Sequence, residues 1–338
     1  MLRYAWSRWQ RLGAASRVCN NCCRRPRIVS RRQAIEPSIQ VLSSQFRKIA
    51  LLGRHSDPRV AEVMTLLAEY LTKAGVEVFA AEDMLLELPV RRAPEAKLAE
   101  HVELLIAIGG DGTMLYAGSL AHAGDVPLLG INRGRLGFLA DVLPDEMLDS
   151  IAHVLAGNYL RESRLILDAR LKKSDGEVVT ATAVNDVVLQ RRETGRMLDF
   201  ETRVAGSFVN SHSGDGLIVS TPTGSTAYSL SCGGPIIEPQ LDAVVVVPIC
   251  PHTLSDRPIV IPASQPIEVR LLEREDTKAE INVDGHSIAE IEPADRLIIS
   301  AASTRITLVH PPGYDYFSIL RTKLFWGRDS RSRDARSR

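Results

Sequence analysis

A continuous apolar run, Leu104–Ile108, is the clearest secondary-structure signal in the chain. Such a run is typical of a strand that is buried on both faces of a parallel sheet. It ends at the glycine-rich turn Gly109–Thr113, after which residues 114–123 follow a helical pattern. The segment therefore predicts a buried strand, a tight turn and a helix.

The segments around this run predict an α/β domain of doubly wound, Rossmann-like type over residues 46–157. Asp57 can cap the first helix and Pro58 can open it, and Gly75 ends it. The remaining expected strands are Arg47–Gly53, Val76–Phe79 and Val126–Asn132, and the remaining expected helices are residues 58–73, 93–101 and 144–156.

From Tyr159 onward the pattern changes to short strands separated by turn signals, with little helical period. This pattern predicts a mostly antiparallel, β-sandwich-like domain over residues 158–312, with a hairpin turn at Asp175-Gly176. A closing helix at 314–326 is expected to return to the first domain within a C-terminal segment, 313–338, whose end is frayed. The expected strands include Leu165–Leu171, Val178–Leu189, Leu198–Val204, Leu217–Ser220, Ala243–Ile249, Ile267–Leu272, Ala279–Val283 and Arg305–Val309.

Charge is distributed unevenly along the 338 residues. Residues 1–48 carry 11 Lys and Arg against one acid, so the rest carries 30 against 40. The acidic body argues against general nucleic-acid binding. Residues 1–45 are expected to lie outside the fold, and three interpretations stay open for them: an Arg-rich targeting segment, a basic disordered tail, or upstream sequence that is not part of the native protein.

Apolar runs and cysteines narrow the class of protein further. No apolar run approaches the roughly 20 residues needed to cross a bilayer, so we expect a soluble protein that does not bind membranes. Five cysteines, two of them isolated at Cys232 and Cys250, do not form a disulfide framework, which favours a cytoplasmic location. Cys19, Cys22 and Cys23 have no second ligand pair nearby, so no bound metal is expected.

The glycine turn carries the first candidate chemistry. A turn between a strand and a helix N-terminus exposes backbone N–H groups, which can cradle phosphate. Asp111 adds a carboxylate to this anion site, where it would repel a phosphate. Its presence therefore indicates a function, such as holding Mg²⁺ on a nucleotide or taking a proton from an attacking hydroxyl. The plain alternative is a strand–helix turn in which Asp111 caps the helix.

A second polar segment, Ser213–Pro235, combines another Gly-Asp-Gly with seven Ser and Thr residues from Ser220 to Ser231 and with Tyr228. Hydroxyls, small residues and glycine backbone suit close approach to a sugar and a base, and Tyr228 can stack on one of them. The plain alternative is a Thr/Pro/Gly-rich surface loop between two strands.

Taken together, these segments resemble the NAD kinase family, bacterial type, over roughly residues 46–325. The motifs that carry the resemblance are Gly109–Thr113, Asn132–Phe138, Asn185-Asp186, Gly214–Pro235 and Pro251–Pro258. The first is shared with diacylglycerol and sphingosine kinases and with phosphofructokinase-like enzymes, whereas the Thr221–Tyr228 stretch is far more specific. The resemblance implies transfer of the γ-phosphate of ATP to the 2′-hydroxyl of the adenosine ribose of NAD, which gives NADP.

The resemblance also assigns roles to individual residues. Asp111 would accept the proton of the ribose hydroxyl. ATP would arrive with Mg²⁺ or another divalent cation, and no metal would be bound by the protein alone. A homodimer or homotetramer built largely through the β domain is implied. The residues that would contact nucleotide or NAD are Gly110, Gly112, Asn185, Asp186, Arg196, Asp215, Thr223, Thr226, Ala227, Tyr228, Ser231 and His286.

Two positions depart from the family pattern. The pair that is usually Asn-Glu is Asn185-Asp186 here, one methylene shorter but still a carboxylate. Many relatives have an Arg shortly before the second Gly-Asp-Gly, where this chain has His212-Ser213, so a preference for NAD⁺ over NADH that depends on that charge is left open.

Two other functions compete with NAD kinase. A lipid kinase of the diacylglycerol or sphingosine type would share the glycine loop but would need an apolar acceptor groove in place of the hydroxyl-rich segment. A catalytically silent NAD(P)-binding regulatory protein would keep the pocket and lose turnover, which the intact Asp111 disfavours.

Overall fold

A computed structural model describes residues 45–54, 56–87, 89–134, 137–192, 197–273 and 278–326. The expectations for the N-terminal extension before Gln45, for Cys19, Cys22 and Cys23, for Arg196 and for the end of the chain after Trp326 lie outside these ranges. Within them, no helix is long and apolar enough to span a membrane.

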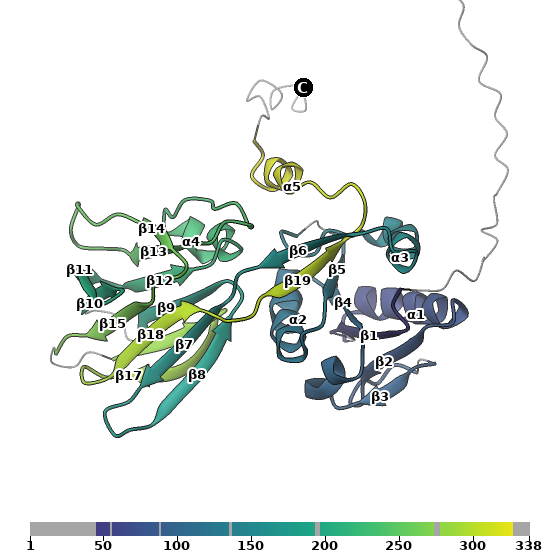
Figure 1. The fold of residues 1–338 in the computed structure, drawn as a ribbon, viewed down its shortest axis with the longest axis horizontal. Coiled ribbons are helices and arrows are strands. Elements are labelled where there is room, and N and C mark those ends of the chain that lie inside the picture. Colours follow the sequence, from purple (N-terminus) through teal and green to yellow (C-terminus); the bar gives the residue numbers. More distant parts are fainter. Residues whose placement is uncertain are drawn as a thin grey trace, which may run out of the picture. The chain divides into compact units, whose positions relative to one another are not determined.

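The first domain is built on a seven-stranded sheet with the strand order β3-β2-β1-β4-β5-β19-β6 (Figure 1). The strands from β3 to β19 run parallel, and β6 pairs antiparallel with β19. Their bounds are β1 Lys48–Gly53, β2 Glu77–Ala81, β3 Arg91–Ala93, β4 Leu104–Gly109, β5 Leu128–Asn132, β6 Leu160–Arg164 and β19 Ile306–His310.

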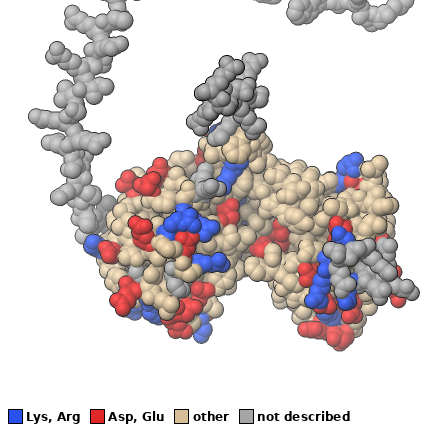
Figure 2. Space-filling model, turned by 180° about the vertical axis from the view of Figure 1, so that it is seen from behind, with Lys and Arg blue, Asp and Glu red and all other residues tan. Residues whose placement is uncertain are grey.

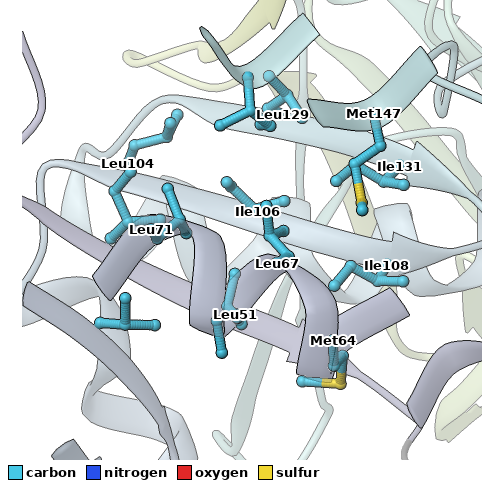
Figure 3. Packing of buried hydrophobic residues seen from close by; sticks show 14 of the residues in the cluster. Leu51, Met64, Leu67, Leu71, Leu104, Ile106, Ile108, Leu129, Ile131 and Met147 are labelled. Atoms are coloured by element: carbon cyan, nitrogen blue, oxygen red, sulfur yellow. The ribbon is translucent and has the colours of Figure 1, made fainter. Parts of the chain in front are cut away.

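Helices cover both faces of this sheet, as the buried runs in the strands require. One face packs against α1 (Pro58–Lys73) and α3 (Met147–Leu155), and the other against α2 (Asp111–Gly124) and the short 3-10 helix η1 (Glu95–Glu100). Figure 3 shows the first of these cores, where side chains of α1 point at those of β1 and β4. A second 3-10 helix, η2 (Pro144–Glu146), leads into α3.

Local sequence signals explain where α1 begins and ends. The Asp57 side chain accepts a hydrogen bond from the Arg59 N–H at 3.1 Å, and Pro58 is the first helical residue. At the other end, Gly75 follows with a φ of +78°, a left-handed conformation that glycine adopts without strain.

The second domain is a sandwich of two six-stranded antiparallel sheets. One has the order β11-β10-β15-β18-β7-β8 and the other β14-β13-β12-β9-β16-β17, and apolar side chains from both form one core. The first sheet consists of β7 Leu167–Lys172, β8 Val178–Ala183, β10 Leu198–Val204, β11 Ser207–Gly214, β15 Ile267–Leu271 and β18 Arg296–Ala301. The second consists of β9 Asp186–Arg191, β12 Gly216–Ser220, β13 Ala243–Ile249, β14 Ile259–Pro262, β16 Ala279–Val283 and β17 His286–Ile291.

One strand prediction was wrong, and a second strand was assigned to the wrong domain. Val178–Leu189 is not one strand: β8 ends at Ala183, and β9 starts at Asp186 in the opposite sheet. The strand expected at Arg305–Val309 is β19, which joins the first domain. Its residues Ile306 and Leu308 pack beside α2 and Val309 packs on the opposite core, so both faces are covered by helices as in a parallel sheet.

The C-terminal segment returns to the first domain as predicted, through a shorter helix than expected. The helix α5 spans Tyr316–Lys323 and is capped by Asp315, whose side chain accepts a hydrogen bond from the Phe317 N–H. The Lys323 ammonium lies 5.7 Å from the centre of the Phe138 ring, in the loop that follows β5. This contact places a C-terminal cation next to the glycine turn.

Candidate active site

The glycine turn joins β4 to α2 as the sequence predicts, with Gly110 as the N-cap residue. The first N–H groups of a helix have no partner within it, so they are available to an anion at this end. At Gly109 an added Cβ would lie 2.2 Å from Thr113 Oγ1, whereas at Gly110 and Gly112 it would meet nothing within 4 Å. Gly109 is therefore needed for the turn itself, and the other two leave open space in front of the backbone.

Asp111 is held by the loop that follows β5. Its Oδ2 accepts a hydrogen bond from the Phe138 N–H at 3.2 Å, and its Oδ1 accepts one from the Leu139 N–H at 3.1 Å. A Cβ at Gly137 would lie 2.3 Å from Oδ1, so only glycine allows this approach. The two amides fix the carboxylate, and each oxygen keeps a lone pair for a further partner.

A cavity of about 570 Å³ opens in front of this carboxylate. Its lining combines the glycine turn with three cationic side chains, those of Arg59 from α1, Arg133 from the loop after β5 and Lys323 from α5. The Asp57 carboxylate contacts both arginines, at 3.0 Å to Arg59 Nη2 and 3.1 Å to Arg133 Nη1. The hydrogen bond from Arg59 lowers the pKa of Asp57. Three cations around an open backbone turn suit a polyanion.

Sequence reasoning missed part of this cavity. Asp57 was expected to cap α1, which it does, but its contact with Arg133 joins residues 76 positions apart. Arg59 and Lys323 carried no motif of their own. The signal available in the sequence was weak: an Arg in the first turn of a helix and a Lys near the end of the chain.

A second cavity, of about 420 Å³, lies on the other side of the turn, where Gly112 and Thr113 face the end of β1. The exposed His286 of β17 lines it, as does Tyr116, whose hydroxyl donates to Glu95 Oε1 at 2.5 Å. This hydrogen bond, together with burial, raises the pKa of Tyr116 to about 12. The structure thus brings His286 of the β domain next to the glycine turn.

The Asn185-Asp186 pair lies where the chain passes from one sheet of the sandwich to the other. The Asp284 carboxylate accepts hydrogen bonds from the N–H groups of Val184, Asn185 and Asp186 at 2.8, 2.8 and 3.1 Å. Asp186 is itself only 5% exposed. Burial, and then the neighbouring charge of Asp284, raises the pKa of Asp186 to about 7. The role of Asp284, between Val283 and Gly285, was not foreseen.

The hydroxyl-rich segment folds into a compact turn after β12. The Thr221 hydroxyl donates to the Val184 carbonyl at 2.7 Å, and Ser225 Oγ donates to the Pro222 carbonyl at 2.6 Å. A Cβ at Gly224 would lie 2.2 Å from the Asn185 carbonyl oxygen. The turn is therefore packed directly onto the Asn185-Asp186 pair. It contains the 3-10 helix η3 (Gly224–Thr226) and the single-turn helix α4 (Tyr228–Ser231).

The predicted contact residues of this turn differ in their exposure. Tyr228 is 43% exposed, Ser231 is exposed, and Thr226 and Ala227 are half-buried, so these four are accessible to a ligand. Thr223 is 7% exposed, and its hydroxyl accepts a hydrogen bond from Arg164 at 3.3 Å. Its side chain therefore contacts protein.

The second Gly-Asp-Gly is partly paired within the protein. Asp215 Oδ1 lies 3.1 Å from Arg191 Nε. The nearby His212 is buried, with Nδ1 3.0 Å from Asp256 Oδ2 and Nε2 2.9 Å from Thr202 Oγ1. His212 is thus held by its neighbours in the sandwich.

The structure brings Gly110 and Asp111 into the first cavity and Gly112 and His286 into the second. The other described residues predicted to bind NAD lie outside both linings, on β9, beside β12 or in the turn after it. No group of three or more His, Cys, Asp or Glu side chains among the described residues could hold a metal ion.

Comparisons with known proteins show the family of this chain. Models of the ATP-NAD kinase N-terminal and C-terminal domains match residues 49–159 and 184–311. The chain belongs to the NAD kinase family. It is 42% identical to an NAD kinase of Nitrosococcus oceani over 291 residues and 43% identical to one of Hahella chejuensis over 293 residues. These alignments cover 85% and 86% of this chain and 99% and 98% of the relatives.

Solved structures show the same fold. The chain superposes on yeast NADH kinase complexed with NADH with a TM-score of 0.75 at 25% identity, covering 83% of this chain and 88% of that one. An NAD kinase from Archaeoglobus fulgidus in complex with ATP gives 0.63 at 23% identity, covering 82% and 97%. The predicted fold class, the NAD kinase resemblance and the assignment as a phosphotransferase are confirmed. Nothing in the comparisons supports a lipid kinase or a silent regulatory protein.

Proposed function

We propose that the basic cavity holds the phosphates of ATP and that Asp111 accepts the proton of the NAD ribose 2′-hydroxyl. One observation carries this proposal: a carboxylate fixed by two backbone amides lies at the rim of a cavity lined by three cations. Arg59, Arg133 and Lys323 would bind phosphate oxygens in this cavity, where the open backbone at Gly110 would donate its N–H group, and Gly112 would donate its N–H group from the side of the second cavity.

The proposed step is an in-line transfer of a phosphoryl group. As the ribose 2′-oxygen forms its bond to the γ-phosphorus, its proton passes to Asp111 and the bond to the bridging oxygen of ADP breaks. A hydroxyl is a poor nucleophile at neutral pH, so a fixed proton acceptor helps it. The rest of the catalysis is positioning and charge neutralisation, which the helix N-terminus and the cations supply.

On the acceptor side, we propose that the turn after β12 and the Asn185-Asp186 pair hold the adenosine of NAD. Thr226, Ala227, Tyr228 and Ser231 are the accessible part of that turn, and the Tyr228 ring offers a face for stacking. Asp215 would face the nicotinamide end and His286 would approach a ligand beside Gly112. Thr223 would contribute through the shape of the turn.

A divalent cation such as Mg²⁺ would be carried to the site by ATP. Asp111 is the carboxylate of the first cavity, and Asn132 adds an amide. Such a sparse donor set fits an ion whose ligands are mainly phosphate oxygens and water. When bound, the ion supplies charge neutralisation for the transferred phosphoryl group.

We propose a homodimer or homotetramer built through the β domain. Both sheets of the sandwich end in strands with exposed apolar side chains: Phe208 and Val209 on β11, and Ile259 and Val260 on β14, are 36–54% exposed. End strands with such side chains are suited to association. Sedimentation of the wild type and of a Phe208→Glu/Val260→Lys variant tests this, and a monomeric wild type would overturn it.

No nucleic-acid partner is proposed. On the face in Figure 2, Lys and Arg side chains alternate with Asp and Glu side chains and do not form one continuous basic surface. The cytoplasmic location and the domain limits at residues 45, 157 and 312 stay predictions.

The assay that tests the proposed site uses purified protein with ATP, Mg²⁺ and either NAD⁺ or NADH. NADP⁺ is scored with a dehydrogenase that reads only NADP⁺, and NADPH by its oxidation with an NADPH-specific enzyme. We expect product that is lost on chelation of Mg²⁺ and restored by adding it back. Turnover that persists after chelation would show that the reaction does not need a divalent cation. The rate with NADH, compared with the rate with NAD⁺, shows whether the enzyme discriminates between the two.

A further inference from the structure

A buried network of ionisable side chains lies along the β6 and β19 strand pair at the edge of the first sheet, together with Asp141 from the segment between β5 and α3. His310 Nδ1 lies 2.8 Å from Asp141 Oδ2, and His310 Nε2 lies 3.0 Å from Glu162 Oε2. Glu162 Oε2 also accepts a hydrogen bond from Arg164 Nη2 at 2.7 Å. The side chains of these four residues are between 3% and 9% exposed. All four residues lie outside the sequence motifs that resemble the NAD kinase family.

Arg164 connects this network to two other parts of the chain. Its Nη1 donates to the Thr223 hydroxyl at 3.3 Å, and its Nη2 donates to the Tyr314 hydroxyl at 3.1 Å. Thr223 belongs to the turn that also contains Tyr228. Tyr314, whose ring stacks on His310 at 3.7 Å between ring centres, lies one residue before the cap of α5, the helix that carries Lys323 into the basic cavity.

We propose that Arg164 is a positioning residue for both substrates. Glu162, which is itself held by His310 and through it by Asp141, fixes the guanidinium, whose two arms hold the adenosine turn through Thr223 and the α5 linker through Tyr314. Arg164 is 3% exposed and its guanidinium is directed at Glu162, Thr223 and Tyr314, so we expect it to act through the last two contacts and not through a ligand. This inference rests on the proposed function, which assigns NAD to the side held through Thr223 and ATP to the side held through Tyr314.

The chemistry of the network fits a positioning role. A buried ion pair can often be replaced by apolar side chains at little cost, so its presence is weak evidence for stability. A guanidinium differs from an apolar side chain and from an ammonium because its planar fork donates in several fixed directions at once. Arg164 uses this fork toward three groups on three separate segments.

Two variants separate the two arms. Thr223→Val removes the first contact, and we expect the KM for NAD to rise about fivefold to tenfold while kcat and the KM for ATP stay within about twofold. Tyr314→Phe removes the second, and we expect the KM for ATP to rise about threefold while the KM for NAD is unchanged. Thr202→Val is the matched control, because it also removes a buried hydroxyl that bonds a buried side chain.

A double-mutant cycle with Arg164→Lys shows whether Thr223 acts through Arg164. The lysine keeps the charge but not the fork, so we expect it to raise both KM values. Adding Thr223→Val to it would then raise the KM for NAD no further. Fully additive effects, or KM values that do not move while the melting temperature falls, would overturn the proposal. We expect every variant of the cycle to keep a measurable kcat. A failure of the Arg164 proposal can therefore be distinguished from a failure of the proposed Asp111 chemistry.

Discussion

The two halves of the proposed site hold their ligands by different physical means. The donor side is an open cavity lined by cations on long side chains, with Arg59 and Arg133 at 68% and 50% side-chain exposure. The acceptor side is compact, with Thr221, Thr223 and Ser225 buried and hydrogen-bonded to protein. The donor side would therefore suit a hydrated, charged group, and the acceptor side would suit a group of fixed shape.

This difference corrects a simple interpretation of hydroxyl density. The seven Ser and Thr hydroxyls from Ser220 to Ser231 suggested direct contacts to a sugar, yet several of them build the turn. Local hydrogen bonds from Ser and Thr to backbone groups are an ordinary way to fix such a turn. The ligand is left with the side chains that the turn presents, namely Thr226, Tyr228 and Ser231.

The largest effect on turnover is expected from a substitution of Asp111, where the donor and acceptor sides of the proposed site meet. Asp111→Asn should lower kcat by about 10²–10⁴-fold, the usual contribution of general-base assistance. Asn keeps the size of the side chain and one acceptor oxygen, so the fold and NAD binding should survive. Turnover and calorimetric binding of NAD measure the two effects separately.

Asp125→Asn is the matched control, because Asp125 is in the left-handed conformation that Asn also tolerates, at the far end of α2. A kcat for Asp111→Asn close to that of this control would mean that another group accepts the proton.

Gly112→Ala tests whether the donor side depends on open backbone. Alanine favours a helix by about 1 kcal/mol over glycine, and the new Cβ meets no protein atom within 4 Å, so stability should stay the same or rise. The methyl group would occupy open space in the second cavity beside the Gly112 N–H that is proposed to bind phosphate, and the KM for ATP should rise about tenfold, as for loss of one charge-assisted hydrogen bond. Thermal unfolding and initial rates measure the two.

In contrast, Gly109→Ala should lower stability, because its Cβ would clash with Thr113. An unchanged KM for ATP in Gly112→Ala would place the phosphates away from this turn.

The sequence predicted the donor turn well because its signals are local. A buried run followed by glycines and a helical pattern defines strand, turn and N-terminus within twenty residues. The β domain was harder. The break between β8 and β9 depends on Asp284, about 100 residues downstream, whose carboxylate accepts the N–H groups of the crossing.

Two further features could not be predicted from the hydrophobic pattern because charged residues form them. The strand β6 contains Glu162 and Arg164, whose side chains point into a buried network, so its pattern did not resemble a covered strand. The cations of the donor cavity come from three distant segments and carry no motif. Tertiary pairing of charges cannot be read from hydrophobic periodicity.

A pH profile of NAD binding tests the acceptor side. The pKa of Asp186 is raised to about 7 in the free protein, so its carboxyl binds a proton below that pH and loses it above. If ribose hydroxyls donate to the ionised carboxylate, NAD affinity should be present above pH 7 and fall as the pH drops, by up to about tenfold between pH 8 and pH 6.

Asp186→Asn should remove this dependence and bind NAD weakly at every pH. A dependence that persists in the variant would assign the titration to another group, and a wild-type affinity that falls as the pH rises would show that the protonated carboxyl binds the ribose.

Arg133→Met should have the smallest effect, because half of its side chain is exposed and exposed charges are screened by salt. We expect the KM for ATP to rise about fivefold at low ionic strength, with kcat and the KM for NAD nearly unchanged. The wild-type KM for ATP should also rise with added salt, and the variant should respond less because one phosphate-binding charge is gone. Arg91→Met serves as the control, since Arg91 pairs with Glu77 on the far edge of the same sheet. If the two variants depend on salt alike, Arg133 does not bind phosphate, and the donor side would rest on the glycine turn and the remaining two cations.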